Sequence, residues 1–175
     1  GFWPEDHRAI RSASWLTEAY QAEIAHADRQ LERLLDTLDE LGRLDRALVI
    51  ATSDHGENLQ EHDHPFDHGD DLFDASLRVP LVFRGPGIVS SNRVACQVSN
   101  MDVTPTILGY LGVDDPHARV GVDLTPVLEG TASCTDALVV ATTLGGRFVD
   151  DPPIDHALRT PQRKLLRPGT GAVEC

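Results

Sequence analysis

An uninterrupted apolar run at residues 47–52 leads directly into the polar sequence Ser-Asp-His-Gly at 53–56. The run shows no alternation of apolar and polar residues, so it predicts a strand that is covered on both faces. Such strands are typical of the interior of a parallel sheet with helices on either side. We therefore expect an α/β fold with a mostly parallel buried sheet that is covered by helices.

The flanking segments fit the same fold class. Residues 14–42 carry apolar side chains at three- and four-residue steps and end at Gly42, which predicts a long amphipathic helix packed on one face of the sheet. A second apolar run at 79–83 predicts the parallel neighbour of the first strand. The remaining elements are expected as a strand at 94–98, a helix at 102–112 with Asp102 as its N-cap, and strands at 138–142 and 158–166.

The charge balance excludes some partners. The sequence has 28 acidic and 15 basic residues, a net charge of −13, which argues against nucleic acid or an anionic membrane surface as a partner. No apolar run approaches the roughly 20 residues of a membrane-spanning helix. No targeting pattern is present, so the compartment stays open, with a slight preference for the cytoplasm. The sequence does not predict an oligomeric state.

Three cysteines, Cys96, Cys134 and Cys175, lie far apart and form no Cys-x-x-Cys pair. Zinc binding is therefore not expected. Free thiols are the default interpretation, and a single disulfide remains an alternative.

Asp54 and His55 are candidate metal ligands because they follow the buried strand at once. Ligand sites in open α/β sheets form beyond the carboxyl ends of strands. A carboxylate and an imidazole suit a divalent cation, although the spacing alone fits a plain Asp-His turn equally well. From residue 54 to 74 there is no lysine or arginine. Most of that segment, with His62 and His64, is interpreted as a solvated acidic loop.

The motifs, taken in order, resemble the sulfatase family of the alkaline-phosphatase superfamily. The resemblance covers about residues 16–166. Its main segments are Leu-Val-Ile-Ala-Thr-Ser-Asp-His-Gly-Glu at 48–57, Phe-Asp-His at 66–68, Leu-Arg-Val-Pro-Leu at 77–81, Gly-Pro-Gly at 85–87, Asp-Val-Thr-Pro-Thr at 102–106 and Leu-Arg-Thr-Pro-Gln-Arg-Lys-Leu at 158–165.

This resemblance implies a partial alkaline-phosphatase-like α/β sandwich. Residues 1–166 would form the C-terminal part of the catalytic domain. Independently of the resemblance, the turn-like composition of 167–175 predicts a frayed tail. Asp54 and His55 would bind a divalent metal ion, with calcium expected first and magnesium or manganese as alternatives. His68 would contact the sulfate oxygens of the substrate.

The implied reaction is hydrolysis of a sulfate monoester, either a small-molecule or a saccharide sulfate. The family's formylglycine nucleophile arises within Cys/Ser-x-Pro-x-Arg, and no cysteine here begins that pattern. No catalytic nucleophile is therefore assigned in this chain, and we expect it to be inactive alone. The alternatives are a phosphonate monoester or phosphodiester hydrolase of the same superfamily, or a non-catalytic remnant.

Overall fold

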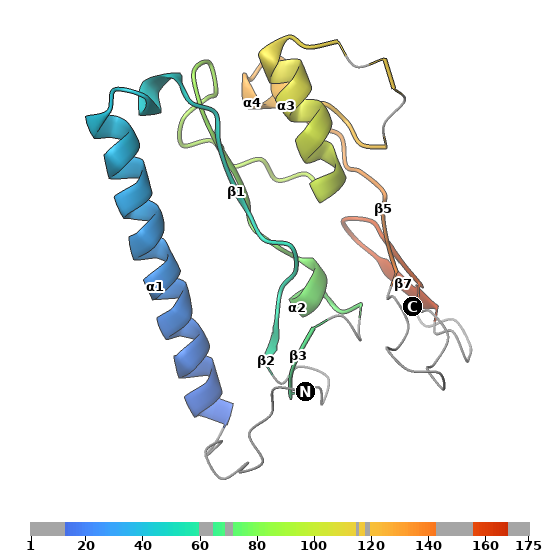
Figure 1. Cartoon of the computed structure of the whole chain (residues 1–175). Coiled ribbons are helices and arrows are strands. Elements are labelled where there is room, and N and C mark those ends of the chain that lie inside the picture. The colour runs from blue at the N-terminus through green and yellow to red at the C-terminus, as the bar shows by residue number, and fades with distance from the viewer. Residues whose placement is uncertain are drawn as a thin grey trace.

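The computed structural model describes residues 13–59, 65–68, 72–114, 116–117, 120–142 and 156–167. His62, His64 and the tail beyond residue 167 lie outside this part of the chain. A long helix stands on one side, a two-stranded sheet runs through the middle, and a three-stranded sheet holds the C-terminal strands (Figure 1). In chain order the elements are α1 Ala13–Glu40, the 3-10 helix η2 Leu44–Arg46, β1 Val49–Thr52, β2 Asn58–Leu59, β3 Pro65–Asp67, α2 Asp74–Leu77, β4 Leu81–Arg84, the 3-10 helix η4 Asn100–Asp102, α3 Val103–Leu111, α4 Thr125–Leu128, β5 Val139–Thr142, β6 His156–Arg159 and β7 Lys164–Arg167.

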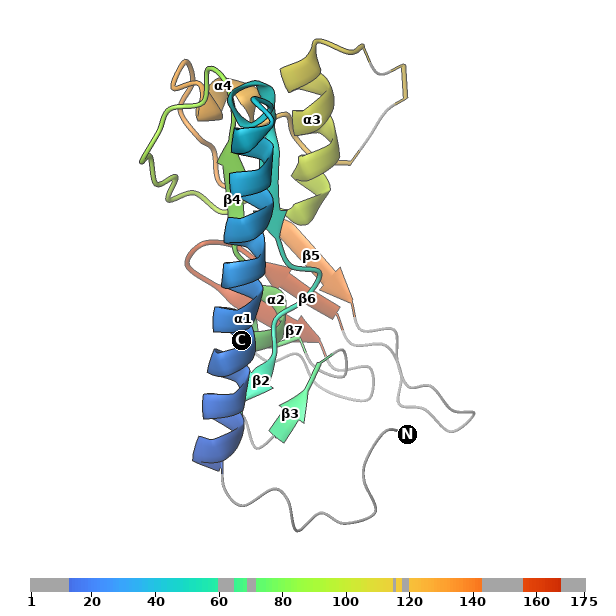
Figure 2. The same ribbon diagram turned by 60° about the vertical axis from the view of Figure 1, so that its left-hand side comes forward.

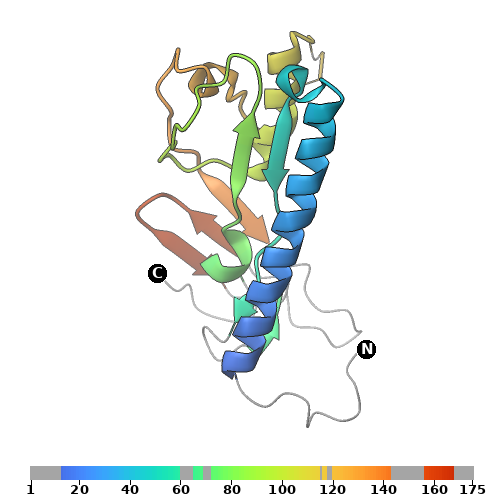
Figure 3. The ribbon, with the colours of Figure 1, turned by 90° about the vertical axis from the view of Figure 1, so that its left-hand side faces the viewer.

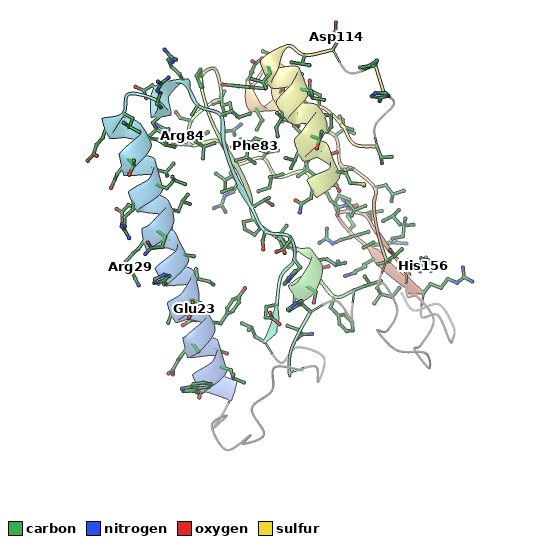
Figure 4. All side chains as sticks on the ribbon, in the orientation of Figure 1. Glu23, Arg29, Phe83, Arg84, Asp114 and His156 are labelled. Atoms are coloured by element: carbon green, nitrogen blue, oxygen red, sulfur yellow. A yellow bond between two sulfur atoms is a disulfide. The ribbon has the colours of Figure 1, made fainter. Side chains whose placement is uncertain are left out.

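The long N-terminal helix is confirmed as α1. It ends where predicted, because Gly42 adopts a left-handed φ of 62° that favours glycine. The backbone N–H of Arg43 then donates to the carbonyl of Leu38 at 2.8 Å and closes the last turn. Its main contacts are with η2 and β2 rather than with a sheet face. Ile24 and Leu34 on its apolar stripe therefore remain 54% and 56% exposed, while Arg29 points away from the other elements (Figure 4).

The central sheet corrects the parallel prediction, because β1 and β4 pair antiparallel. Val49 lies opposite Arg84, and Thr52 lies opposite Leu81 (Figure 3). A parallel pair needs a long crossover connection, usually a helix. The described part of this connection holds only the short strands β2 and β3 and the single turn of α2. The chain thus reverses, and β4 begins beside the end of β1. The predicted burial is also wrong, because no residue of β1 or β4 is fully buried and Val82 of β4 is 57% exposed. An apolar run does not fix strand direction, and it does not ensure that both faces are covered.

The C-terminal strands differ from expectation in number. The strand at 138–142 is confirmed as β5, but the segment expected at 158–166 forms two strands, β6 and β7. They are joined by a turn in which the N–H of Thr160 donates to the carbonyl of Arg163 at 2.8 Å. The sheet order is β5-β6-β7, antiparallel throughout (Figure 2). No strand forms at 94–98, so that prediction was wrong.

Helix α3 confirms the predicted helix, but Asp102 does not cap it as expected. The Ser99 side chain accepts the N–H of Met101, and Asp102 Oδ2 accepts the N–H of Ser99 at 2.8 Å, so Ser99 caps the preceding turn η4. Asp102 is only 3% exposed, and its Oδ1 accepts the N–H of Val122 at 2.8 Å. This carboxylate therefore joins the start of α3 to the segment that leads into α4.

The thiol interpretation is also corrected, since Cys96 and Cys134 form a disulfide. Their Cα atoms lie 6.0 Å apart, a usual separation for such a bond. The disulfide joins the segment before η4 to the segment after α4. Cys175 lies outside the described residues.

An ion-pair cluster fastens the C-terminal hairpin to α2. Arg159 donates from Nε and Nη2 to the two oxygens of Asp74 at 3.2 and 2.9 Å, and Lys164 Nζ adds a third bond at 3.0 Å. The hydrogen bonds from Arg159, followed by those from Lys164, lower the pKa of Asp74 from 3.8 to about 2. Arg159 Nη1 also donates to Gln97 Oε1. Figure 2 shows β6 and β7 lying beside α2.

Within the described part of the chain, no helix combines the length and the apolar character needed to cross a bilayer.

The Asp74 cluster predicts acid-sensitive stability. The pKa of Asp74 is lower in the folded state than in the unfolded state, so its stabilisation is complete above about pH 4 and is lost as the pH falls towards about 2. The carboxylate is partly exposed, and solvent screening reduces its contribution to about 1 kcal/mol. Arg159→Met should lower the free energy of unfolding by about that amount near neutral pH, and by less near pH 2. Urea denaturation measures both values. Arg29→Met is the matched control, and an equal loss in the control would contradict the assignment.

Candidate functional site

The turn that carries the candidate ligands is held at its start by Asn100. Its amide Nδ2 donates to the carbonyl of Ser53 at 3.0 Å, and its Oδ1 accepts the hydroxyl of Thr52 at 3.2 Å. The end of β1 and the first residue of the turn are therefore fixed from η4. Nothing in the sequence indicated this role, because Asn100 lies 47 residues from Ser53 and belongs to no recognised pattern.

Gly56 lies against the backbone of α2. Its N–H donates to the carbonyl of Ser76 at 2.7 Å, and a Cβ built on it would overlap the carbonyl oxygen of Ala75. A glycine directly after a strand commonly serves a tight turn. The structure gives a different reason, because Gly56 is not among the residues with positive φ and is required for close backbone approach. This contact fixes the end of the turn, whereas Asn100 fixes its start.

Asp54 and His55 converge, as ligands of one cation would. His55 Nε2 lies 3.7 Å from Asp54 Oδ2, and the Asp54 side chain is 87% exposed. His55 Nδ1 lies 2.8 Å from the carbonyl of Gly56, which can only accept a hydrogen bond. Nδ1 therefore carries the proton, and in the neutral ring Nε2 keeps a lone pair that faces Asp54. A backbone carbonyl that fixes the ring in this way is typical of metal-binding histidines.

Asp54 is held in its ionised form. The hydrogen bond from the His55 N–H to Oδ1, 3.0 Å long, is the first cause of its lowered pKa. The N–H of Asp54 itself is the second cause of the lowered pKa. An ionised carboxylate beside an imidazole lone pair matches the donor chemistry of a divalent cation. A metal role for the two residues stays a prediction.

These two side chains are an incomplete ligand set. Among the described residues, no group of three or more His, Cys, Asp or Glu side chains is placed to hold a metal ion. Calcium takes six to eight oxygen ligands, and magnesium takes six in a regular octahedron. Two protein ligands can thus bind such an ion only weakly.

His68 lies at the same place and contacts His55 directly. The two rings are stacked, with centroids 3.9 Å apart and planes inclined by 15°. His68 Nδ1 also lies 3.1 Å from Glu57 Oε2. The structure therefore brings together all three residues predicted for the site. Glu57 was not singled out in the sequence, although its two-residue spacing from His55 placed it on the same face of an extended chain.

Known proteins resemble this chain over the segment that contains the site. The family model described as Sulfatase matches residues 6–113. Arylsulfatase K of Bos taurus is 37% identical over 107 residues, which are 61% of this chain and 19% of that protein. Choline-sulfatase of Rhizobium meliloti (strain 1021) is 37% identical over 115 residues, which are 64% of this chain and 22% of that protein. The chain thus spans about a fifth of the length of these relatives.

Solved structures share the fold. The phosphonate monoester hydrolase of Agrobacterium radiobacter superposes with a TM-score of 0.75 at 26% identity, over 86% of this chain and 32% of that chain. A protein solved in complex with its substrate D-glucosamine-2-N,6-O-disulfate gives a TM-score of 0.70 at 26% identity, over 86% of this chain and 31% of that chain. These likenesses support the expected α/β fold of the alkaline-phosphatase type, although the strands that the structure describes pair antiparallel.

The close contact at Gly56 predicts that Gly56→Ala disturbs the site. The added methyl group must displace α2 or the turn, at a cost of about 1–3 kcal/mol in the free energy of unfolding. The nuclear Overhauser effect between the rings of His55 and His68 should weaken at the same time.

Gly42→Ala is the control for this substitution. Its Cβ meets nothing within 4 Å, so it pays only the left-handed strain of about 1–2 kcal/mol and should leave the ring contact intact. An unchanged ring contact in Gly56→Ala would contradict the prediction.

Proposed function

The chain belongs to the sulfatase family, and from this premise we propose that it supplies metal-binding and sulfate-binding residues of a metal-dependent sulfate monoester hydrolase. The observation that carries the proposal is the convergence of Asp54 and His55, 3.7 Å apart, at the end of β1. Family membership indicates sulfate ester hydrolysis in general, and the geometry supports a division of roles among the residues.

Asp54 and His55 would hold the cation, with calcium expected first and magnesium or manganese as alternatives. A bound cation would supply positive charge to stabilise the developing charge on the sulfate oxygens. The chain needs such a charge, because its net charge is −13 and residues 54–74 include no lysine or arginine. An anionic substrate would otherwise be repelled.

His68 would contact the sulfate group. Its ring is stacked on His55, so a group bound at the Nε2 edge of His68 lies close to whatever His55 binds. The imidazole side chains thus link the proposed metal ligands to the proposed substrate contact. Small-molecule and saccharide sulfates are the substrate classes we propose, by analogy with the choline-sulfatase and with the protein solved with a glucosamine disulfate.

The nucleophile is proposed to lie outside these 175 residues. No cysteine or serine in the sequence begins a Cys/Ser-x-Pro-x-Arg pattern, from which the family's formylglycine arises. The remaining metal ligands are proposed to lie outside it as well, since Asp54 and His55 form only part of a ligand set.

Phosphonate monoester hydrolysis is a second candidate. It is favoured by the structural likeness to the Agrobacterium radiobacter enzyme, which is as close as that to the structure with a sulfated substrate. The residues of the described site suit a phosphonate oxygen as well as a sulfate oxygen. The two candidates share the roles of Asp54 and His55 and differ in the group that is cleaved.

Metal binding tests the proposal directly. Calorimetric titration with Ca²⁺ should detect weak binding to the wild-type chain, and Asp54→Ala or His55→Ala should weaken it about tenfold or more. Asp45→Ala is the matched control, because Asp45 is an exposed carboxylate away from the site. Equal affinities in Asp54→Ala and Asp45→Ala would refute the metal assignment.

Turnover tests the location of the nucleophile. The chain alone, supplied with Ca²⁺, Mg²⁺ or Mn²⁺, should release no 4-nitrophenol from 4-nitrophenyl sulfate above background. Turnover that Asp54→Ala abolishes would show that the chain carries its own nucleophile. Turnover of a 4-nitrophenyl phosphonate ester, with none of the sulfate, would favour the second candidate.

A further inference from the structure

Glu57 has a place in this site that neither the motif nor the proposed roles assign. We propose that Glu57 is a positioning residue that fixes the ring of His68, so that the Nε2 edge of that ring faces the substrate. The inference rests on the proposed function for the identity of the substrate. The contacts that support the role of Glu57 join residues of this chain and do not depend on the substrate.

The pairing of β2 with β3 places Glu57 opposite His68. Asn58 pairs with Asp67 across the antiparallel ladder. Glu57 precedes Asn58 and His68 follows Asp67, so one further step along the ladder brings these two residues face to face. Asn58 is fully buried, which anchors the position from which the Glu57 side chain extends. The backbone thus aligns the pair before the side chains make contact.

Glu57 is also the more restrained carboxylate of the site. Its side chain is 19% exposed, whereas that of Asp54 is 87% exposed. A mostly covered side chain has few rotamers left, so its hydrogen bond to His68 Nδ1, 3.1 Å long, restricts the ring more than a surface pair would. The exposed carboxylate of Asp54 is accessible to a bound cation. The carboxylate of Glu57 points at His68 and can hold that ring in place.

Two contacts among the described residues constrain the orientation of His68. The stack on His55 sets the plane of the ring, with centroids 3.9 Å apart. The bond to Glu57 sets the rotation within that plane, because a carboxylate accepts and Nδ1 must then donate. Nε2 is left on the edge that points away from Glu57. A flip of the ring by about 180° about its Cβ–Cγ bond would keep the stack but exchange the positions of Nδ1 and Cδ2, and the bond to Glu57 opposes that flip.

The tautomer of the wild-type chain is the first test. Long-range ¹H–¹⁵N spectra at alkaline pH, where a histidine ring is neutral, report which nitrogen carries the proton. We expect the proton of His68 on Nδ1. A proton on Nε2 in the wild type would overturn the proposal without any substitution.

Substitution of Glu57 is the second test. Glu57→Leu keeps the side-chain volume but has no acceptor, so the Nδ1–H form should be lost and the ring contact with His55 should weaken. Glu57→Gln retains a polar partner for Nδ1 and should preserve the ring contact. Glu23→Ala on α1 (Figure 4) removes the same charge at a distance and should change neither signal. An unchanged tautomer and ring contact in Glu57→Leu would overturn the proposal.

Sulfate binding separates this inference from the proposed function. Inorganic sulfate added to the Ca²⁺-supplied chain should shift the His68 Nε2 signal, and Glu57→Leu should weaken that binding severalfold. Absence of any shift in the wild type would refute the substrate contact of His68, while the tautomer would still decide the role of Glu57. A shift of equal affinity in Glu57→Leu would refute the positioning role alone.

Discussion

The close approach of Gly56 to the backbone of α2 is the contact on which the site depends. The hydrogen bond from Gly56 to Ser76 and the absence of a side chain at Gly56 let two backbones lie together. The position of α2 is set in turn by Asp74, which Arg159 and Lys164 hold from the C-terminal hairpin. Strands β6 and β7 therefore support a turn that lies about a hundred residues earlier in the sequence.

Buried polar contacts join the start of α3 to the segment that leads into α4. Within the described residues the buried apolar side chains are Leu72, Leu124 and Ala157, while Asn58, Ser76, Asp102, Thr106 and Thr125 are buried polar residues. Thr106 accepts the N–H of Leu124 at 3.0 Å and donates to the carbonyl of Asp102 at 2.6 Å. Buried polar groups stabilise a fold only when they are paired in this way. This network fixes η4, from which Asn100 reaches the site.

The electrostatics of the site follow from its position in an acidic chain. The pKa of Asp54 is lowered mainly by hydrogen bonds from backbone N–H groups, which favour its charged form. Glu57 contacts His68, and Asp74 forms an ion pair with Arg159 of the hairpin. The two carboxylates therefore have different partners. Of Asp54, Glu57 and Asp74, Asp54 has the most exposed side chain, and His55 Nε2 lies on the side of its carboxylate.

The sequence alone determined the elements whose signals are local. The period of α1, its end at Gly42, the helix α3 with its end at Gly112 and the convergence of Asp54 with His55 all depend on residues within a few positions of one another. The order of the motifs was enough to identify the family. Only the tertiary structure decided the antiparallel direction of β1 and β4, the partner of Cys96, and the supporting roles of Glu57 and Asn100. Strand direction and long-range pairing depend on how the connecting segments reverse the chain, and neither periodicity nor composition records that path.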